Sequence, residues 1–392
     1  MPAIRINGFD EEWELKPLSE LCSFHQGLTY HPSDVVKENG VLVLRSSNIQ
    51  ESVLCFDDNV YVSPTKTTKY KAQKDDILMC VRNGSSKLVG KCATINDYAS
   101  GMAWGAFMTI IRPFDKTNSF VFHYLNSPFF RKQISGGSET GMINQITFGT
   151  LNSIFINVPK INEMNAISNL LDMVNERIAV QSSIVKKLKK LHRNSAISVL
   201  DMIGDHNVVC LSDVLTERKE KNINSDKTIC SVAVEDGVVD QIQHLGRSFA
   251  AKNVSNYKVV CPGDLVYTKS PTGSFPYGIF KQSFIKDKVA VSPLYAIYYA
   301  SDTDVAFYLH HYFLSEVNTN NYLHPLVEKG AKNTMNISNE RAVAGYVRFP
   351  NERNLKKVCN FLRIIDERVS HEQELLDKLI EQKQILLSGM FC

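Results

Sequence analysis

The chain has 392 residues, with 44 basic and 41 acidic side chains, so its formal net charge is only +3. Apolar residues make up 44% and charged residues 22%, a balance typical of globular proteins, and the length suits two or more domains. A net charge so close to zero excludes a chain that is basic throughout, so any nucleic-acid-binding surface must be local.

The sequence contains no feature of a membrane or secreted protein. No segment approaches the roughly 18 consecutive apolar residues that a membrane span needs. Residues 1–16 carry acids and lack the apolar core of a signal peptide. The nine cysteines are scattered, and their odd number argues against a complete disulfide framework. We therefore expect a protein of the reducing cytoplasm that does not contact the membrane.

The sequence contains an internal repeat: the second half resembles the first at an offset of about 191 residues. Short segments match in the same order in both halves, whereas the stretches between them hardly agree. One framework therefore carries two different sets of loops. The matching pairs are 17–21 with 210–214, 75–79 with 263–267, 155–159 with 346–350, and 175–177 with 366–368.

Each half begins with short elements and ends in a long helix. Apolar runs at 41–44, 77–81 and 108–111, separated by Gly, Asn, Ser and Pro clusters, are typical of strands. After Pro159 and Pro350 the pattern becomes helical. It predicts one helix over 162–193 and another over 351–387 that is closed by Gly389.

Both predicted helices carry an apolar stripe in the same register, interrupted at Gln181 and at Glu372. A stripe this long requires a partner helix, and the obvious partner is the second predicted helix, which carries the same stripe. The positions expected at this helix-pair interface are Leu171, Val174, Ile178, Val185 and Leu188 in the first helix and Leu362, Ile365, Val369, Leu376 and Leu379 in the second.

These observations predict an α+β fold of two globular domains related by an internal repeat, each followed by a long helix. We place the domains at 1–160 and 201–350 and the helices at 161–200 and 351–392. The only clear basic excess lies in 161–200, with 6 basic and 3 acidic residues. We interpret it as a solvated helix face, with contact to phosphate or to an acidic partner as the alternative.

Several segments imitate catalytic motifs without completing them. Residues 126–129 lack the first proline of the Asn-Pro-Pro-Tyr/Phe element of amino-methyltransferases, and a Ser-Pro pair instead favours a helix start. Residues 84–92 have the wrong glycine spacing for a phosphate loop. Ser212 and Asp213 fit a helix cap better than a nuclease site. His310 and His311 are expected as a partly buried pair within a helix. We therefore expect no catalytic residue, no metal and no cofactor.

Polar segments that follow the predicted strands have a composition suited to DNA. Arg, Lys and Asn side chains reach base edges, and Ser, Thr and glycine amides bind phosphates. These segments stand at matching points of the two halves, which favours DNA recognition. The candidate DNA-binding residues are Arg45, Ser47, Asn48, Arg82, Asn83, Ser85, Lys87 and Thr140 in the first half and Lys269, Ser270, Thr272, Ser274, Lys332 and Asn333 in the second.

Essentially the whole chain resembles the specificity (S) subunit of type I restriction–modification systems. The resemblance rests on the opening at 13–21, the Gly/Asp-Asp-Ile/Leu strand with its basic loop, the stretch from Thr140 to Ile146, the exit from Pro159 into a helix, and the duplication. It implies two target-recognition domains joined by two helices that pack as an antiparallel coiled coil. It also implies double-stranded DNA, two DNA (adenine) methyltransferase subunits and a restriction motor subunit as partners. Lys332-Asn333-Thr334 departs from the Thr-Gly pair expected in the second half.

Two other classes of function remain open at this point. The chain could be a non-enzymatic coiled-coil adaptor whose domains bind protein partners, or a self-contained nuclease or methyltransferase. The favoured reading is a non-catalytic subunit that recognises a bipartite, asymmetric DNA target, because two domains with different loops are related by an approximate two-fold axis, like the strands of a duplex.

Overall fold

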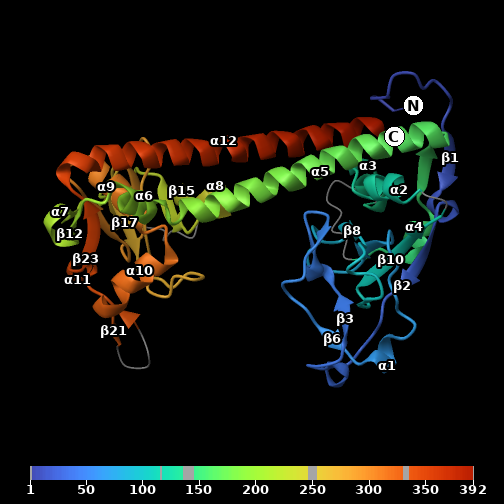
Figure 1. The fold of residues 1–392 in the computed structure, drawn as a ribbon, viewed down its shortest axis with the longest axis horizontal. Helices are drawn as coiled ribbons and strands as arrows, with labels where there is room; N and C mark the ends of the chain where they lie inside the picture. Colours follow the sequence, from blue (N-terminus) through green and yellow to red (C-terminus); the bar gives the residue numbers. More distant parts are fainter. Residues whose placement is uncertain (1, 115–116, 136–144, 246–253, 330–334, 392) are drawn as a thin grey trace. The chain divides into compact units, whose positions relative to one another are not determined.

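The computed structural model describes residues 2–114, 117–135, 145–245, 254–329 and 335–391 (Figure 1). The chain forms two compact units. Unit 1 contains residues 1–181 and 375–392, and unit 2 contains residues 182–374. Two long helices, α5 (Ile161–His192) and α12 (Glu352–Met390), each contribute residues to both units. Within the described ranges, no helix is both long and apolar enough to cross a membrane.

Unit 1 is built on an antiparallel four-stranded sheet with the order β2-β10-β7-β8. All four residues of β7 are buried because the sheet is covered on both faces: Ile77 and Met79 join one apolar cluster, and Leu78 and Cys80 join another. A strand buried on both faces reads as an unbroken apolar run. The strands are β1 (Glu14–Pro17), β2 (Cys22–Gln26), β3 (Val41–Leu44), β4 (Ile49–Gln50), β5 (Val53–Leu54), β6 (Tyr61–Val62), β7 (Ile77–Cys80), β8 (Cys92–Thr94), β9 (Ala103–Trp104), β10 (Met108–Pro113) and β11 (Phe155–Val158).

Short helices and smaller sheets complete unit 1. Strand β1 pairs with β11 directly before α5, and β6-β3-β9 form a second sheet. The predicted strands at 41–44, 77–81 and 108–111 are confirmed as β3, β7 and β10. The helices are η1 (Leu18–Glu20), η2 (Pro32–Asp34), η3 (Ser46–Asn48), α1 (Pro64–Thr67), α2 (Asn118–Leu125), α3 (Pro128–Ile134) and α4 (Phe148–Asn152).

Unit 2 has the same plan. Its main sheet has the order β13-β20-β17-β18, and β12 pairs with β23 directly before α12. Strand β17 is again fully buried. The strands are β12 (His206–Cys210), β13 (Thr216–Glu217), β14 (Ile229–Ala233), β15 (Gly237–Asp240), β16 (Lys258–Val260), β17 (Leu265–Thr268), β18 (Ile279–Gln282), β19 (Val289–Val291), β20 (Ala296–Tyr299), β21 (Glu328–Lys329), β22 (Met335–Asn336) and β23 (Tyr346–Pro350).

The second sheet of unit 2, β15-β14-β19-β16, has four strands, one more than β6-β3-β9 in unit 1. The units therefore differ mainly outside the main sheet. The helices of unit 2 other than α5 and α12 are α6 (Ser195–Ile203), α7 (Leu211–Val214), α8 (Gln241–Leu245), α9 (Thr303–Tyr312), α10 (Glu316–Leu323), η4 (His324–Leu326) and α11 (Asn339–Ala342).

A tight turn precedes one of the two inner strands of each main sheet, β7 in unit 1 and β17 in unit 2, here called the central strand. In unit 1 the turn runs over 73–76, and Asp75 adopts a φ of 67°. In unit 2 it runs over 261–264, and Gly263 adopts a φ of 87° after Pro262. A proline followed by a residue with positive φ is the pattern of a type II turn. The matching segments found in the sequence are therefore turn–strand units.

The last residue of each turn is a buried aspartate that binds an arginine. Asp76 is 2% exposed and accepts hydrogen bonds from Nε of Arg112 at 2.7 Å and from its Nη2 at 2.8 Å. Asp264, also 2% exposed, binds Arg218 in the same two-pronged manner at 2.6 and 3.0 Å. Each carboxylate also accepts a hydrogen bond from the first amide of its own turn. The arginines come from non-equivalent strands, since Arg112 lies on β10 and Arg218 follows β13.

The long helices begin and end close to their predicted limits, with one error. Helix α5 differs by one residue at each end from the predicted range of 162–193. Helix α12 continues through Gly389, so the prediction that this glycine closes the helix is wrong. Gly389 instead permits a close approach of the N-terminal segment. Its carbonyl accepts a hydrogen bond from the Ile4 amide at 2.8 Å, and a Cβ atom would lie 2.5 Å from Cδ1 of Ile4.

Of the two predicted helix caps, one is confirmed and one is wrong. Ser127 caps α3 by accepting the amide of Phe130 at 3.2 Å, which confirms the Ser-Pro helix start. Ser212 and Asp213 lie inside α7, whose N-cap is Cys210, so the prediction of a cap at Ser212 is wrong. The chain enters α7 one residue earlier because the Leu211 amide is held by the carbonyl of Gly345, beside the β12–β23 pair.

We predict that Asp76→Asn destabilises unit 1 by about 3 kcal/mol, because it leaves the Arg112 guanidinium facing a buried group that no longer balances its charge. The matched control is Asp97→Asn, which breaks the exposed Lys74–Asp97 ion pair of the same unit, with side chains 57% and 82% exposed. This control should change stability by less than about 1 kcal/mol. Urea unfolding followed by circular dichroism measures both effects, and equal losses would contradict the assigned role of Asp76.

Candidate nucleic-acid interface

Two loops of unit 1 that were predicted to bind DNA lie together in the structure. One loop, with η3, follows β3, and the other follows β7. Asn83 joins them, since its Nδ2 donates to Oγ of Ser46 at 3.2 Å. Asn83 Oδ1 also accepts the amide of Ser85 at 3.0 Å, which shapes the second loop. The structure thus brings together loops that are 37 residues apart in the sequence.

Arg82 is an exposed cation of this pair of loops. Its side chain is exposed, and its guanidinium lies 5.5 Å from the centre of the Phe107 ring. Phe107 is itself 58% exposed. An arginine stacked on an exposed aromatic ring is held in one direction while its N–H groups stay free for a ligand. Phe107 lies in the turn between β9 and β10 and was not identified from the sequence, because nothing in its local pattern separates it from other exposed aromatic residues.

Arg45 and Ser47 line a cavity of about 770 Å³ in unit 1. The Arg45 guanidinium is already paired with Asp58 at 2.8 Å. Its charge is therefore balanced before any ligand arrives, which makes it a weaker phosphate contact than Arg82. The Ser47 hydroxyl is buried and forms no hydrogen bond, so it is available to a group that enters the cavity. Phe107 lines the same cavity.

Asn48 was expected to contact DNA and has a different position. It is 0% exposed, and its Oδ1 accepts the Arg45 amide at 2.9 Å. Its Nδ2 donates to the carbonyl oxygens of Cys55 and Asp58 at 3.0 and 3.2 Å. Asn48 therefore holds the loop that carries Arg45 and is removed from the candidate contacts. A buried asparagine whose hydrogen bonds are all made within the chain cannot also bind a base.

The loop after β7 contributes two further exposed candidates, Ser85 and Lys87. A partly buried lysine supports the neighbouring loop: Lys91 donates to the carbonyl of Ile49 at 2.7 Å, and its partial burial lowers the pKa of its amine. Thr140 lies outside the described residues.

In unit 2 the corresponding loop follows β17. Lys269 is partly buried, and both this burial and the nearby Lys258 ammonium lower the pKa of its amine. Ser270, Thr272 and Ser274 are exposed on the turn that follows. The carbonyl of Ser274 accepts Nδ2 of Asn320 at 3.0 Å, which ties this turn to α10. The candidates Lys332 and Asn333 lie outside the described residues.

The residues predicted at the helix pair all lie on the buried or half-buried side of α5 and α12. Leu171 belongs to an apolar cluster of unit 1 that also contains Leu387 and Met390 of α12. Leu362 belongs to the main apolar cluster of unit 2. Both leucines are 0% exposed, so they serve the cores of the units as well as the helices.

Among the described residues, the side chains that could hold a metal ion form one group of three, His192, His311 and Asp366, in unit 2. In the sequence, these three residues are distant from the loops that follow β3, β7 and β17. Glu217 and Arg218, which follow α7, have partners within the unit: Glu217 accepts a hydrogen bond from Asn339, and Arg218 is bound to Asp264.

Comparisons with known proteins give one consistent result. Residues 10–198 match the family described as "Type I restriction modification DNA specificity domain". The chain is 29% identical over 169 residues to the type I restriction enzyme EcoKI specificity subunit of Escherichia coli (strain K12). The aligned segment covers 41% of this chain and 36% of that protein. It is 26% identical over 197 residues to the StySPI specificity subunit of Salmonella potsdam, which covers 48% of this chain and 42% of that protein.

Solved structures agree at the level of the fold. The S subunit of a type I restriction–modification system from M. genitalium matches with a TM-score of 0.54 and 12% identity, over 100% of this chain and 99% of that one. A chain from a structure of the assembly of a type I restriction–modification system matches with a TM-score of 0.55 and 13% identity, over 96% and 97%. The matched segments span less than half the length of the curated relatives. The predicted resemblance is confirmed: residues 10–198 match the type I restriction modification DNA specificity family, and the chain has the mixed helix-and-sheet fold of type I S subunits.

Proposed function

We propose that the chain is a non-catalytic subunit that recognises a bipartite, asymmetric duplex target and directs methyltransferase and restriction subunits to it. One observation carries the proposal. In each unit a polar loop with a basic residue follows the central strand, β7 or β17, of a main sheet with the same strand order, and the two loops differ in sequence. Two domains with the same sheet order and different loops suit a target made of two different half-sites, one for each domain.

The proposed contacts to DNA come from both units. Arg82 is the first choice for a base contact, because the Phe107 ring orients its guanidinium and no ion pair of the described residues neutralises it. Exposed Ser85 and Lys87, with Ser270, Thr272 and Ser274, suit phosphates. Arg45, Ser47, Asn83, Lys269, Thr140, Lys332 and Asn333 remain in the proposed contact set.

We further propose that the units arose by duplication and that 1–160 and 201–350 are target-recognition domains. Residues 161–200 and 351–392 would then carry two spacer helices that pack as an antiparallel coiled coil. Contacts within unit 2 support this packing: Lys189 Nζ donates to Gln373 Oε1 at 2.9 Å, and His192 lies 2.7 Å from Asp366. The end of α5 thus contacts the middle of α12.

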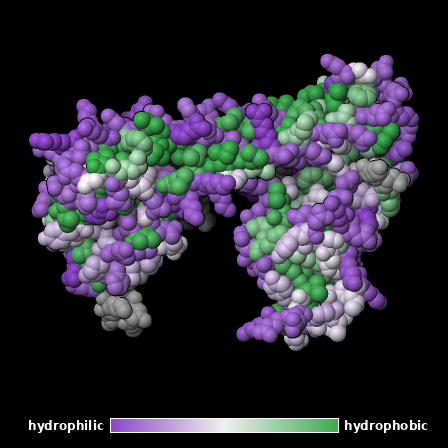
Figure 2. Space-filling view, in the orientation of Figure 1, coloured by the Kyte–Doolittle hydropathy of each residue, from purple (hydrophilic) through white to green (hydrophobic). Residues whose placement is uncertain are grey.

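The proposed protein partners are two DNA (adenine) methyltransferase subunits and a restriction motor subunit. Both curated relatives are named as specificity subunits of restriction enzymes, which supports this. An apolar surface on α5 also supports it. Met173 and Val180, one heptad apart in unit 1, are 61% and 55% exposed. In Figure 2 apolar surface is visible along the long helices. Exposed apolar side chains in register on a helix suit a partner protein.

We predict that Arg82→Ala weakens recognition of one half-site by about 1–3 kcal/mol and leaves the other unchanged, because a bidentate contact to guanine is lost. Lys269→Ala should affect the other half-site. Binding is measured on duplexes that carry base changes in one half-site at a time, with methyltransferase partners present.

The matched control is Lys74→Ala. Lys74 precedes β7, whereas Arg82 follows it, so the two cations lie at opposite ends of one strand, and Lys74 is already paired with Asp97. This variant should bind all duplexes as the unchanged protein does. A uniform loss on every DNA for Arg82→Ala would identify a phosphate contact and contradict base recognition.

The spacer is tested by lengthening both helices together. One heptad is inserted after Gln181 in α5 and one after Glu374 in α12, which preserves the register of the apolar stripes. Each helix grows by about 10 Å, equal to about three base pairs of duplex. The gap between half-sites should therefore lengthen by about three base pairs, while the half-site sequences stay the same. Mapping of methylated adenines measures both, and an unchanged gap would rule out the helices as the spacer.

The partner surface is tested by the double variant Met173→Glu with Val180→Glu. We expect at least a tenfold loss of affinity for the methyltransferase subunits, since about 1.4 kcal/mol corresponds to a factor of ten. The control is Val53→Glu on β5, an equally exposed apolar residue of the same unit, at 58%. Analytical ultracentrifugation of mixtures gives the affinity. If the control variant lost affinity as well, the surface on α5 would not be specific.

A further inference from the structure

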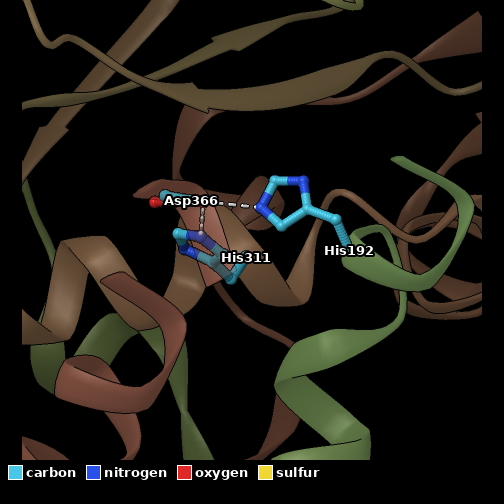
Figure 3. Close-up of side chains that lie close together, drawn as sticks. All are labelled: His192, His311 and Asp366. Carbon is cyan, nitrogen blue, oxygen red and sulfur yellow. Dashed lines mark hydrogen bonds and ion pairs between the residues drawn. The ribbon is translucent and has the colours of Figure 1, made fainter. Parts of the chain in front are cut away.

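Three side chains from distant parts of the sequence meet inside unit 2: His192 on the last turn of α5, His311 on α9 and Asp366 on α12 (Figure 3). Nε2 of His192 lies 2.7 Å from Oδ1 of Asp366, and Nε2 of His311 lies 3.0 Å from the same oxygen. One ligand atom from each residue lies within 4.8 Å of the other two. Both imidazoles thus point at one carboxylate oxygen.

The other nitrogen of His311 determines which atom of the ring carries a hydrogen. Nδ1 lies 2.9 Å from the carbonyl oxygen of Phe307, one turn earlier on α9. A carbonyl can only accept, so Nδ1 is the donor. In a neutral imidazole Nε2 then has a lone pair, which faces an oxygen of Asp366 that also has only lone pairs. This arrangement requires a positive centre between the two atoms, either a second proton or a metal ion.

The surroundings match those of a metal ligand. A histidine bound to a metal usually donates its other N–H to a carboxylate or a backbone carbonyl, which fixes the ring, as Phe307 does for His311. Asp366 Oδ1 is the atom that both imidazoles approach.

The site also has space for a further ligand. The positive charge of the neighbouring Arg193 is paired with carboxylates. A cavity of about 200 Å³, lined by His192, Lys281 and Glu235 among others, adjoins it. The neighbouring Arg193 is paired with Glu235 at 2.6 Å and lies 3.9 Å from Glu316, so its charge is largely balanced. Lys281 is also buried at this cavity, and burial lowers its pKa to about 8.

We propose that His192, His311 and Asp366 bind one divalent transition-metal ion, with water from the adjoining cavity as the fourth ligand. Imidazole and carboxylate donors suit zinc in tetrahedral geometry. Ligand atoms at about 2.0–2.1 Å from zinc lie about 3.3 Å apart. The two observed nitrogen–oxygen distances, 2.7 and 3.0 Å, need to widen by about 0.6 and 0.3 Å. The ion joins the end of α5 to α9 and α12 within unit 2.

Unit 1 contains a related pair that lacks the third ligand. His123 and His311 each precede a tyrosine, and Nε2 of His123 lies 2.8 Å from Oδ1 of Asp172 on α5. The other partner of Asp172 is the hydroxyl of Ser119, at 2.7 Å, and not a second imidazole. The proposed ion therefore belongs to unit 2 alone, and one equivalent per chain is expected.

The test uses the full chain, purified without a histidine tag and dialysed against a chelator. Zinc is titrated calorimetrically, and cobalt(II) is added as a spectroscopic substitute. We expect one ion per chain and visible cobalt bands without intense thiolate charge transfer. Affinity should fall by at least about tenfold in His192→Ala and in Asp366→Asn. Zinc should also raise the unfolding temperature of the unchanged protein but not that of the variants.

The control is His371→Ala, which removes an exposed histidine from α12 five residues after Asp366. This variant should bind zinc like the unchanged protein. His192 is 18% exposed and Asp366→Asn preserves shape, so circular dichroism should show both variants folded. Absence of stoichiometric binding, thiolate bands with cobalt, or equal affinity in folded variants would overturn the proposal and leave a hydrogen-bonded His–Asp–His group. None of these outcomes depends on DNA binding.

Discussion

The buried aspartate below each central strand is the constraint on which both units depend. Removing a carboxylate from water is costly unless its charge is paired and its oxygens accept hydrogen bonds. Asp76 and Asp264 meet both conditions through an arginine and the first amide of their own turn. The turn, the start of the strand and a neighbouring strand are thus held together at one end of the sheet. The loop at the opposite end is free of this constraint and can differ between the units.

The sequence predicts the elements whose signal is local. The helix limits follow from the proline that precedes each helix and from the spacing of apolar residues, and both starts are within one residue. Buried strands such as β7 are recognisable as apolar runs. Errors occur where a distant contact decides. Gly389 remains helical because Ile4 packs on it, and Ser212 lies inside a helix because the Leu211 amide is held by Gly345.

In the candidate interface, too, the local sequence predicts some features and tertiary contacts decide the others. Its loops are found from their place after a strand, but the role of each side chain depends on its tertiary partners. Asn48 and Asn83 have the same chemistry in the sequence, yet one is buried with its amide used inside the chain and the other links two loops. Phe107 cannot be identified without the fold, because only the fold places it below Arg82. Composition therefore identifies a surface, and packing decides which of its residues can reach a ligand.

The histidine group extends this reasoning to chemistry that no spacing rule detects. Metal motifs are recognised in a sequence when their ligands lie on one helix turn or one hairpin, where a few residues separate them. His192, His311 and Asp366 come from three helices and are separated by 119 and 55 residues. They meet because α9 packs in unit 2 beside the end of α5 and the first half of α12. A fold that brings helix ends together for packing thus also creates polar sites, and the hydrogen-bond partners of each imidazole then show what such a site can hold.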